Sequence, residues 1–152
     1  DFDVTAILPE GYFQIADPQW YSSTILLHSY KPEDPAKDPY MELVISYNDS
    51  LSDVTFDDNI SLSDFEAQAK ALMTDAESGD EIAYTVDKTA AGTRILIADT
   101  ANYTEFATIW HGFEISVFAY MSDGETYSPI SQAQRTAIMK YLSDLDISKM
   151  VK

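Results

Sequence analysis

The stretch YTEFATIWHGFEISVFAY, residues 103–120, decides how this chain folds. Apolar and polar side chains alternate on both sides of His111-Gly112, and Phe106 and Trp110 fall on the same face of the first half. Alternation over this length indicates two half-buried strands. A glycine after a residue that tolerates positive φ is typical of a two-residue turn. The sequence therefore predicts an antiparallel β-hairpin across this stretch.

Further segments on both sides of the hairpin show a period of two. Apolar side chains fall on one face and polar ones on the other, which is typical of half-buried strands bounded by turn residues. A loop with three prolines, residues 31–39, separates two of these segments, and we expect it to be extended and solvated. The predicted strands, in chain order, cover residues 1–8, 12–15, 24–30, 41–47, 82–86 and 94–99.

Two other segments show helical spacing and begin with helix-capping residues. Ser63 is followed by Glu66 three positions later, which predicts a capping box, and Ser78-Gly79 predicts the end of that helix. Near the C-terminus, Ser128 before a proline predicts the start of a second helix. The apolar stripe of this second helix consists of Ile138, Tyr141, Leu142 and Leu145.

The order of these elements predicts the fold class. The chain has 152 residues, of which 45% are hydrophobic, so residues 1–152 are sufficient to bury a core as a single domain. Strands, a helix, a run of antiparallel strands and a final helix are typical of the α+β class. We expect an antiparallel sheet of about six strands packed between the two helices.

The turns and elements of the chain resemble those of PsbP-like domains. Residues 8–12, LPEGY, are similar to the apolar-Pro-x-Gly-aromatic motif that follows the opening strand in this family. The similarity continues through the expected helix at 63–78, the turns at Gly92 and at residues 110–113, and the closing residues 145–147. It therefore covers most of the chain.

This resemblance carries expectations about fold and role. The family includes the photosystem II extrinsic protein, a eukaryotic Ran-binding regulator and many exported bacterial proteins. It implies an antiparallel sheet with helices on both faces, which is an α/β/α sandwich, and a non-catalytic role in binding or assembly. It implies no functional residue, because no motif of the photosynthetic or Ran-binding branch occurs in this sequence.

The charge of the chain excludes some classes of partner. Nine Lys and Arg residues stand against 26 Asp and Glu residues, so the formal net charge is -17. Nucleic acids and anionic lipids bind clustered basic residues, which this sequence lacks. Residues 1–76 hold 15 of the acids and 3 of the bases, so the acidity is concentrated in the first half. The partner that this charge favours is a protein with a basic surface.

The composition also bears on chemistry and location. The absence of cysteine excludes disulfides, iron–sulfur clusters, cysteine-based zinc sites and thiol catalysis. The absence of cysteine, combined with strong acidity and many Tyr, Asp and Thr residues, favours an exported or cell-surface bacterial protein. The chain begins at Asp1, so we expect an export signal or lipid anchor upstream. The longest stretch without a charged residue, 18–30, has 13 residues, too few to span a bilayer.

The strongest candidate binding residues are aromatic. They flank the proline-rich loop, where exposed rings can stack on a sugar or anchor a partner protein. The alternative is that they pack the loop onto the sheet. These residues are Trp20, Tyr21, Tyr30 and Tyr40.

Catalytic and metal sites have weaker support. His28 falls in a strand and His111 in a turn, and no Gly-x-Ser-x-Gly motif accompanies them, so both are interpreted as structural. The carboxylate pairs are sequence neighbours in loops, not groups placed across a cleft. Those pairs are Glu33/Asp34 and Asp57/Asp58. A weak calcium site remains an alternative to a solvated acidic loop at Asp49, Asp53, Asp57, Asp58 and Asn59, although they lack EF-hand spacing.

Three functions follow as hypotheses from these observations. The first is a non-enzymatic exported or cell-surface module that binds a protein partner, without a cofactor. The second is a carbohydrate-binding accessory module that uses the aromatic residues around the proline-rich loop. The third, which the sequence favours least, is an enzyme that uses a pair of loop carboxylates.

Overall fold

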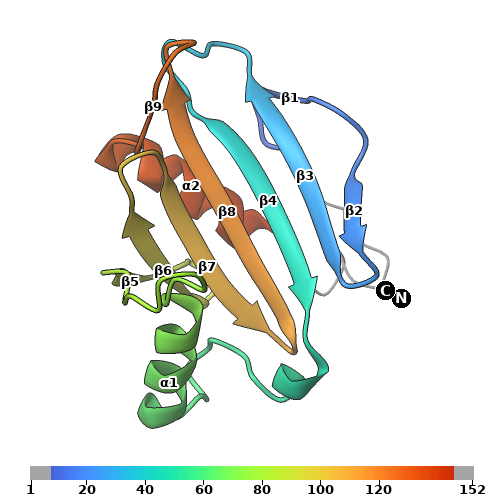
Figure 1. Cartoon of the computed structure of the whole chain (residues 1–152), viewed down its shortest axis with the longest axis vertical. Coiled ribbons are helices and arrows are strands. Elements are labelled where there is room, and N and C mark those ends of the chain that lie inside the picture. The colour runs from blue at the N-terminus through green and yellow to red at the C-terminus, as the bar shows by residue number, and fades with distance from the viewer. Residues whose placement is uncertain (1–7, 146–152) are drawn as a thin grey trace.

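The computed structural model describes residues 8–145, and within this range the chain forms one large antiparallel sheet with two helices (Figure 1). A single 3-10 turn, η1, lies between the fourth strand and the first helix. The elements are β1 (Tyr12–Gln14), β2 (Gln19–Ser22), β3 (Ile25–Pro32), β4 (Tyr40–Tyr47), η1 (Asp49–Leu51), α1 (Leu62–Leu72), β5 (Thr85–Lys88), β6 (Arg94–Asp99), β7 (Thr104–Trp110), β8 (Phe113–Ser122), β9 (Tyr127–Ser128) and α2 (Gln132–Asp144).

The sheet is built around five long strands in the order β3-β4-β8-β7-β6. At one edge β1 and β2 both pair with β3, and at the other edge β5 pairs with β6. The short strand β9 pairs with the end of β8. Because β4 pairs with β8, the first and second halves of the chain meet in the middle of the sheet.

The predicted hairpin at residues 103–120 is confirmed as β7 and β8. His111 and Gly112 form its turn, with φ values of 43° and 84°. In β8, buried and half-buried residues alternate as the sequence predicts. The longer predicted strands at 24–30, 41–47 and 94–99 are likewise confirmed as β3, β4 and β6, whereas most of the strand predicted at residues 1–8 lies outside the described residues.

The larger hydrophobic core lies between α2 and one face of the sheet (Figure 1). Ile138, Tyr141 and Leu142 of α2 pack against the strands, as the predicted apolar stripe requires. The strand residues beneath them are nearly all fully buried. They include Leu26, Tyr30, Met41, Leu43, Ile45, Phe106, Ile115 and Val117.

A second, smaller core lies on the opposite face and under α1. Phe65, Ala69 and Met73 of this helical segment pack with Leu96 of β6 and Ile109 of β7. Phe56 completes this cluster and meets Phe65 edge-on, with ring centroids 4.9 Å apart. Helix α1 therefore covers only the β6–β7 end of its face.

The expected six-stranded sandwich is wrong in two respects. Within residues 8–145 the sheet has nine strands rather than about six, and β2 and β9 have only four and two residues, which is too short for alternation to reveal them reliably. The strand predicted at 12–15 is confirmed as β1, whereas the one predicted at 82–86 lies later in the chain, as β5. The sheet is also not enclosed by helices on both faces. In β4, alternate residues are buried against α2, and the residues between them remain half-buried on the other side.

The start of α1 differs from the predicted one. Ser61, not Ser63, caps the helix by accepting a hydrogen bond from the Asp64 backbone N–H at 3.2 Å. Ile60 before the cap and Phe65 in the first turn belong to the same hydrophobic cluster, which is the arrangement of a hydrophobic staple. This packing selects the earlier serine.

The predicted end of α1 at Ser78-Gly79 is also wrong. The helix ends at Leu72, and the next residue, Met73, accepts a hydrogen bond from the Ile82 backbone N–H at 2.7 Å. Thr74 then forms a β-bridge with Glu81. The chain therefore turns back immediately after the helix.

Helix α2 also begins later than predicted. Ser131, not Ser128, is the N-cap, and its capping box with Gln134 is complete. The residue before the cap, Ile130, is buried in the larger core, and its N–H donates to Thr104 Oγ1 at 3.1 Å. The burial of Ile130 therefore fixes where the helix begins.

Candidate functional site

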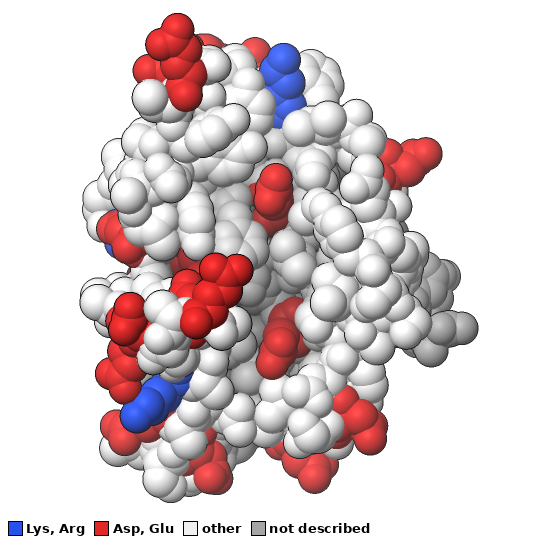
Figure 2. Space-filling model, viewed as in Figure 1, with Lys and Arg blue, Asp and Glu red and all other residues white. Residues whose placement is uncertain are grey.

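Among residues 8–145, no helix covers the side of the sheet that faces away from α2 over β3, β4, β8 and the start of β7. We call this surface the open face. Figure 2 shows it from the front, hollowed along its middle, with acidic side chains inside the hollow. Its residues are half-buried because each lies between neighbours in a sheet that no helix covers there. They are Leu27, Ser29, Tyr40, Glu42, Val44, Ser46, Glu105, Glu114, Ser116, Phe118 and Tyr120.

Aromatic rings gather at one end of the open face. Tyr40 of β4 and Tyr120 of β8 are register partners, and their rings stack with centroids 5.5 Å apart and planes inclined by 7°. Tyr127 of β9 meets Tyr120 edge-on at 5.2 Å, and Tyr103 meets Phe118 edge-on at 5.4 Å. The fold therefore brings together aromatic residues from four parts of the chain: β4, the residue before β7, β8 and β9.

Carboxylates lie directly beside this cluster. Phe118 of β8 has Glu42 of β4 as its partner on one side and Glu105 of β7 on the other. Further along β8, Glu114 lies opposite Ser46. Among residues 8–145, no hydrogen bond or ion pair engages these three carboxylates, and β4, β7 and β8 contain no Lys or Arg.

Burial affects the ionisation of these groups. It raises the pKa of Glu105 and of Glu114 above the ordinary value, because the sheet surface replaces part of the water around each carboxylate. The pKa of Tyr120 is also raised, first by burial and then by the negative charge of Glu42. The open face is thus a surface on which negative charge is incompletely solvated, so an external cation is favoured there.

The four aromatic residues expected from the sequence do not share one surface. Trp20 and Tyr21 lie on edge strand β2, with 48% and 68% of their surface exposed. Tyr30 is 1% exposed within the larger core, which agrees with the alternative that these aromatic residues pack inside the protein instead of binding a ligand. Tyr40 lies on the open face, so it is the member of the set that joins a larger aromatic cluster.

The two histidines occupy the positions that their sequence context predicts. His28 lies within β3 and is 4% exposed, and its ring stacks on Tyr30. His111 lies in the β7–β8 turn, where its ring meets Trp110 edge-on at 4.8 Å.

The loop carboxylates hold turns or pair with bases. Asp34 Oδ1 accepts the Ala36 N–H, and Asp57 Oδ1 accepts the Asn59 N–H. Asp58 pairs with Lys88, which lowers the pKa of Asp58. Within residues 8–145, no group of three or more His, Asp or Glu side chains is placed to hold a metal ion, so the carboxylates of the alternative calcium site do not come together.

The sequence contains a signal for the open face that the expected site does not use. Phe118 and Tyr120 are large aromatic residues at the positions of β8 that alternate out of phase with its buried face. Glu42 and Glu105 lie far apart in the chain and meet at Phe118 only through the strand register. The aromatic residues could therefore have been found from alternation, but their acidic neighbours could not.

In comparisons with protein-family models, curated proteins and solved structures, nothing matches this chain. The resemblance to PsbP-like domains therefore stays a prediction. Neither helix within the described range is long and apolar enough to cross a membrane.

Proposed function

We propose that this protein is a non-catalytic binding module whose open face takes a basic segment of a partner protein. One observation carries the proposal: three half-buried carboxylates that form no hydrogen bond or ion pair with the described residues lie on the same surface as an aromatic cluster. The cysteine-free acidic composition supports placing the module outside a bacterial cell, as an exported or cell-surface protein.

The chemistry of the open face matches Lys and Arg side chains. A guanidinium or ammonium group between Glu42 and Glu105 interacts with two negative charges in a partly desolvated position. The same group lies over the ring of Phe118, where a cation–π contact contributes about 0.5–2 kcal/mol. Tyr40 and Tyr120 provide rigid apolar surface for the rest of the partner segment.

Matched peptides and variants test this proposal. The probe is a fluorescent Arg-Gly repeat peptide of nine residues, and its citrulline counterpart keeps the shape without the charge. We expect the arginine peptide to bind and the citrulline peptide to bind at least tenfold more weakly. The Glu42→Gln/Glu105→Gln double variant should reduce the affinity for the arginine peptide at least tenfold, measured by fluorescence anisotropy.

The control removes the same amount of charge elsewhere. Glu66 on α1 and Glu77 after it are exposed, so Glu66→Gln/Glu77→Gln should change the affinity less than threefold. An equal loss in both double variants would show that the whole acidic molecule, not the open face, attracts the peptide. Binding of a neutral oligosaccharide that Tyr40→Ala abolishes, without binding of the arginine peptide, would assign the module to carbohydrate instead.

A further inference from the structure

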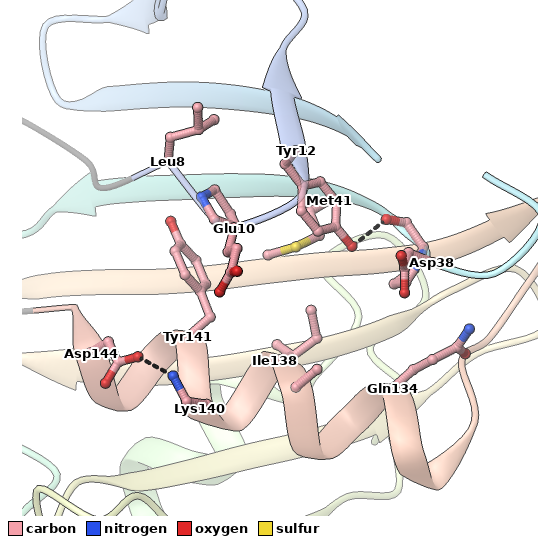
Figure 3. Close-up of a pocket in the computed structure, with 13 residues that line it drawn as sticks. Leu8, Glu10, Tyr12, Asp38, Met41, Gln134, Ile138, Lys140, Tyr141 and Asp144 are labelled. Carbon is pink, nitrogen blue, oxygen red and sulfur yellow. Dashed lines mark hydrogen bonds and ion pairs between the residues drawn. The ribbon is translucent and has the colours of Figure 1, made fainter. Parts of the chain in front are cut away.

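A separate pocket lies on the other side of the sheet, between α2 and the segment that leads into β1 (Figure 3). Its volume is about 420 Å³, which is within the range of small-molecule sites. Residues 8–12 form one wall, residues 38–41 form the back, and α2 forms the opposite wall. The open face does not contribute to it, so this pocket is a different candidate site.

The floor of the pocket is apolar and belongs to the larger core. Met41, Ile138 and Tyr141 are 2%, 3% and 8% exposed, and Pro9 and Pro39 are also buried. Side chains this deeply packed keep their positions without a ligand. The pocket is therefore formed in advance, and its floor favours a hydrocarbon body.

Hydrogen bonds within the protein hold the walls of the pocket in place and engage the polar groups of Tyr12 and Gln134. The Tyr12 hydroxyl donates to the Pro39 carbonyl oxygen at 2.7 Å. Gln134 Oε1 accepts the Ser131 N–H in the capping box, and Gln134 Nε2 donates to the Lys37 carbonyl at 2.8 Å. Burial, and then the charge of Asp38, raises the pKa of Tyr12 far above its ordinary value, so this hydroxyl keeps its proton.

The charged groups of the pocket are predominantly acidic. Lys140 pairs with Asp144 on α2 at 3.0 Å, and the charge of Glu10 also acts on the Lys140 ammonium group. Lys140 is the one base that lines the described pocket, against the carboxylates of Glu10, Asp38 and Asp144. The remaining carboxylates are Glu10 and Asp38, and no hydrogen bond or ion pair among the described residues engages either of them. In Figure 3, the Glu10 carboxylate points toward α2 over the apolar floor, and Asp38 lies beyond Tyr12.

We propose that this pocket binds a small apolar amine, with its hydrocarbon body on Met41, Ile138 and Tyr141 and its ammonium group at Glu10 or Asp38. The two carboxylates repel an anion of the same shape. A neutral analogue keeps the apolar contact and loses the charge interaction. The charge of the ligand therefore decides its affinity.

Three probes of nearly equal shape test the charge preference. They are phenethylammonium, 2-phenylethanol and phenylacetate, each titrated into the full chain and followed by amide chemical shifts. We expect phenethylammonium to bind at least fivefold more tightly than the alcohol, and phenylacetate to bind more weakly than both. The shifts should fall on residues of α2 and residues 38–41. The Glu10→Gln/Asp38→Asn double variant should bring the affinities of the amine and the alcohol within twofold of each other.

A pair of matched substitutions on α2 tests the location. Ala137 lines the pocket and is exposed, so Ala137→Trp fills it without disturbing the core and should reduce amine binding at least tenfold. Ala133 is exposed on the same helix outside the pocket, so Ala133→Trp should leave binding unchanged. Thermal unfolding of both variants checks that the helix is intact. The proposal is overturned if no probe binds, if phenylacetate binds as tightly as the amine, or if both tryptophan variants behave alike.

Discussion

At the scale of a single residue, His28 is a polar side chain placed in an apolar environment. It lies in β3 on the face that packs against α2, and its register partner is Leu43. Its Nε2 atom has no hydrogen-bond partner among the described residues. Burial lowers the pKa of His28 below its ordinary value of 6.5, because a buried imidazolium loses its hydration.

This pKa shift predicts a loss of stability in mild acid. Below pH 6.5 the unfolded chain binds a proton at His28 before the folded chain does, so the free energy of unfolding falls as the pH falls toward the folded-state pKa. The loss is at most about 1.4 kcal/mol per pH unit. Urea denaturation at pH 7.5 and 5.5 should show this loss in the wild type, and His28→Leu should reduce it.

The half-buried glutamates contribute the opposite dependence of stability on pH, so the wild type alone does not isolate the effect of His28 and the His28→Leu variant is needed. Burial raises the pKa values of Glu105 and Glu114, so protonation of these groups favours the folded state as the pH falls. The difference between wild type and His28→Leu isolates the histidine. His111→Asn, at an exposed turn position with positive φ, is the control. An unchanged pH dependence in His28→Leu would show that His28 does not cause the loss.

At the scale of an element, the β7–β8 hairpin depends on the glycine in its turn. Gly112 has a φ of 84°, and a Cβ atom there would lie 2.8 Å from Tyr47 Cε2 and 3.0 Å from the Asn48 carbonyl oxygen. Gly92 has a similar φ of 90°, but no atom lies within 4 Å of the corresponding Cβ position. The two glycines therefore separate backbone strain from steric contact.

Alanine substitutions at these two positions should differ in cost. Gly92→Ala should lower the free energy of unfolding by about 1–2 kcal/mol, because it forces an L-residue into the left-handed region. Gly112→Ala should lower it by about 1–3 kcal/mol more, because the neighbouring loop must also move. Urea denaturation measures both. Equal losses of unfolding free energy in the two variants would mean that the loop after β4 moves away from the added Cβ atom without loss of stability.

The same hairpin shows what sequence can predict at this scale. Alternation over residues 103–120 is long enough to specify two strands and a turn, and the structure confirms both. The two-residue strand β9 carries no comparable pattern, and its pairing is set by β8. Helix α1 begins earlier than the sequence predicts because Ser61 and Ser63 are both suitable N-caps in isolation. Only the packing of Ile60 and Phe65 distinguishes them.

Alternation marks Phe118 and Tyr120 as lying off the buried face of β8, but the sequence does not show that this other face is open, for a related reason. Alternation shows that a strand has two faces, but it does not show which face a helix covers. Helix α1 reaches only β6 and β7, so Glu42 and Tyr120 remain at the surface. Tyr30 was predicted as a site residue and is buried, because its position in β3 faces α2. The location of a helix over a sheet is a tertiary property that a local pattern does not encode.

At the scale of the whole molecule, the charge is far from balanced. Residues 8–145 contain 23 Asp and Glu residues and 7 Lys and Arg residues. Four bases in this range form ion pairs, and Arg94 lies over the ring of Phe65 instead, with Cζ 5.0 Å from the ring centroid. Most carboxylates in the folded protein therefore repel one another without a compensating base.

This imbalance predicts that salt stabilises the fold and weakens the proposed partner interaction. Between 0.02 and 0.3 M NaCl the screening length falls from about 20 Å to about 6 Å, so repulsion among carboxylates of the compact chain decreases. Thermal unfolding should show a Tm that rises by a few degrees over this range. The affinity of the open face for the Arg-Gly peptide should fall over the same range, because salt screens attraction and repulsion alike.

A charge-altered variant distinguishes repulsion from a general effect of salt. Asp53 and Glu66 are exposed, and Asp53→Lys/Glu66→Lys raises the net charge from -17 to -13. If repulsion limits stability, this variant has a higher Tm at low salt and a smaller rise with salt than the wild type. Its binding of the Arg-Gly peptide at fixed salt should change less than that of Glu42→Gln/Glu105→Gln, because its substitutions lie outside the open face. A Tm that rises equally in both proteins would instead attribute the stabilisation to salt acting on apolar burial, which does not depend on net charge.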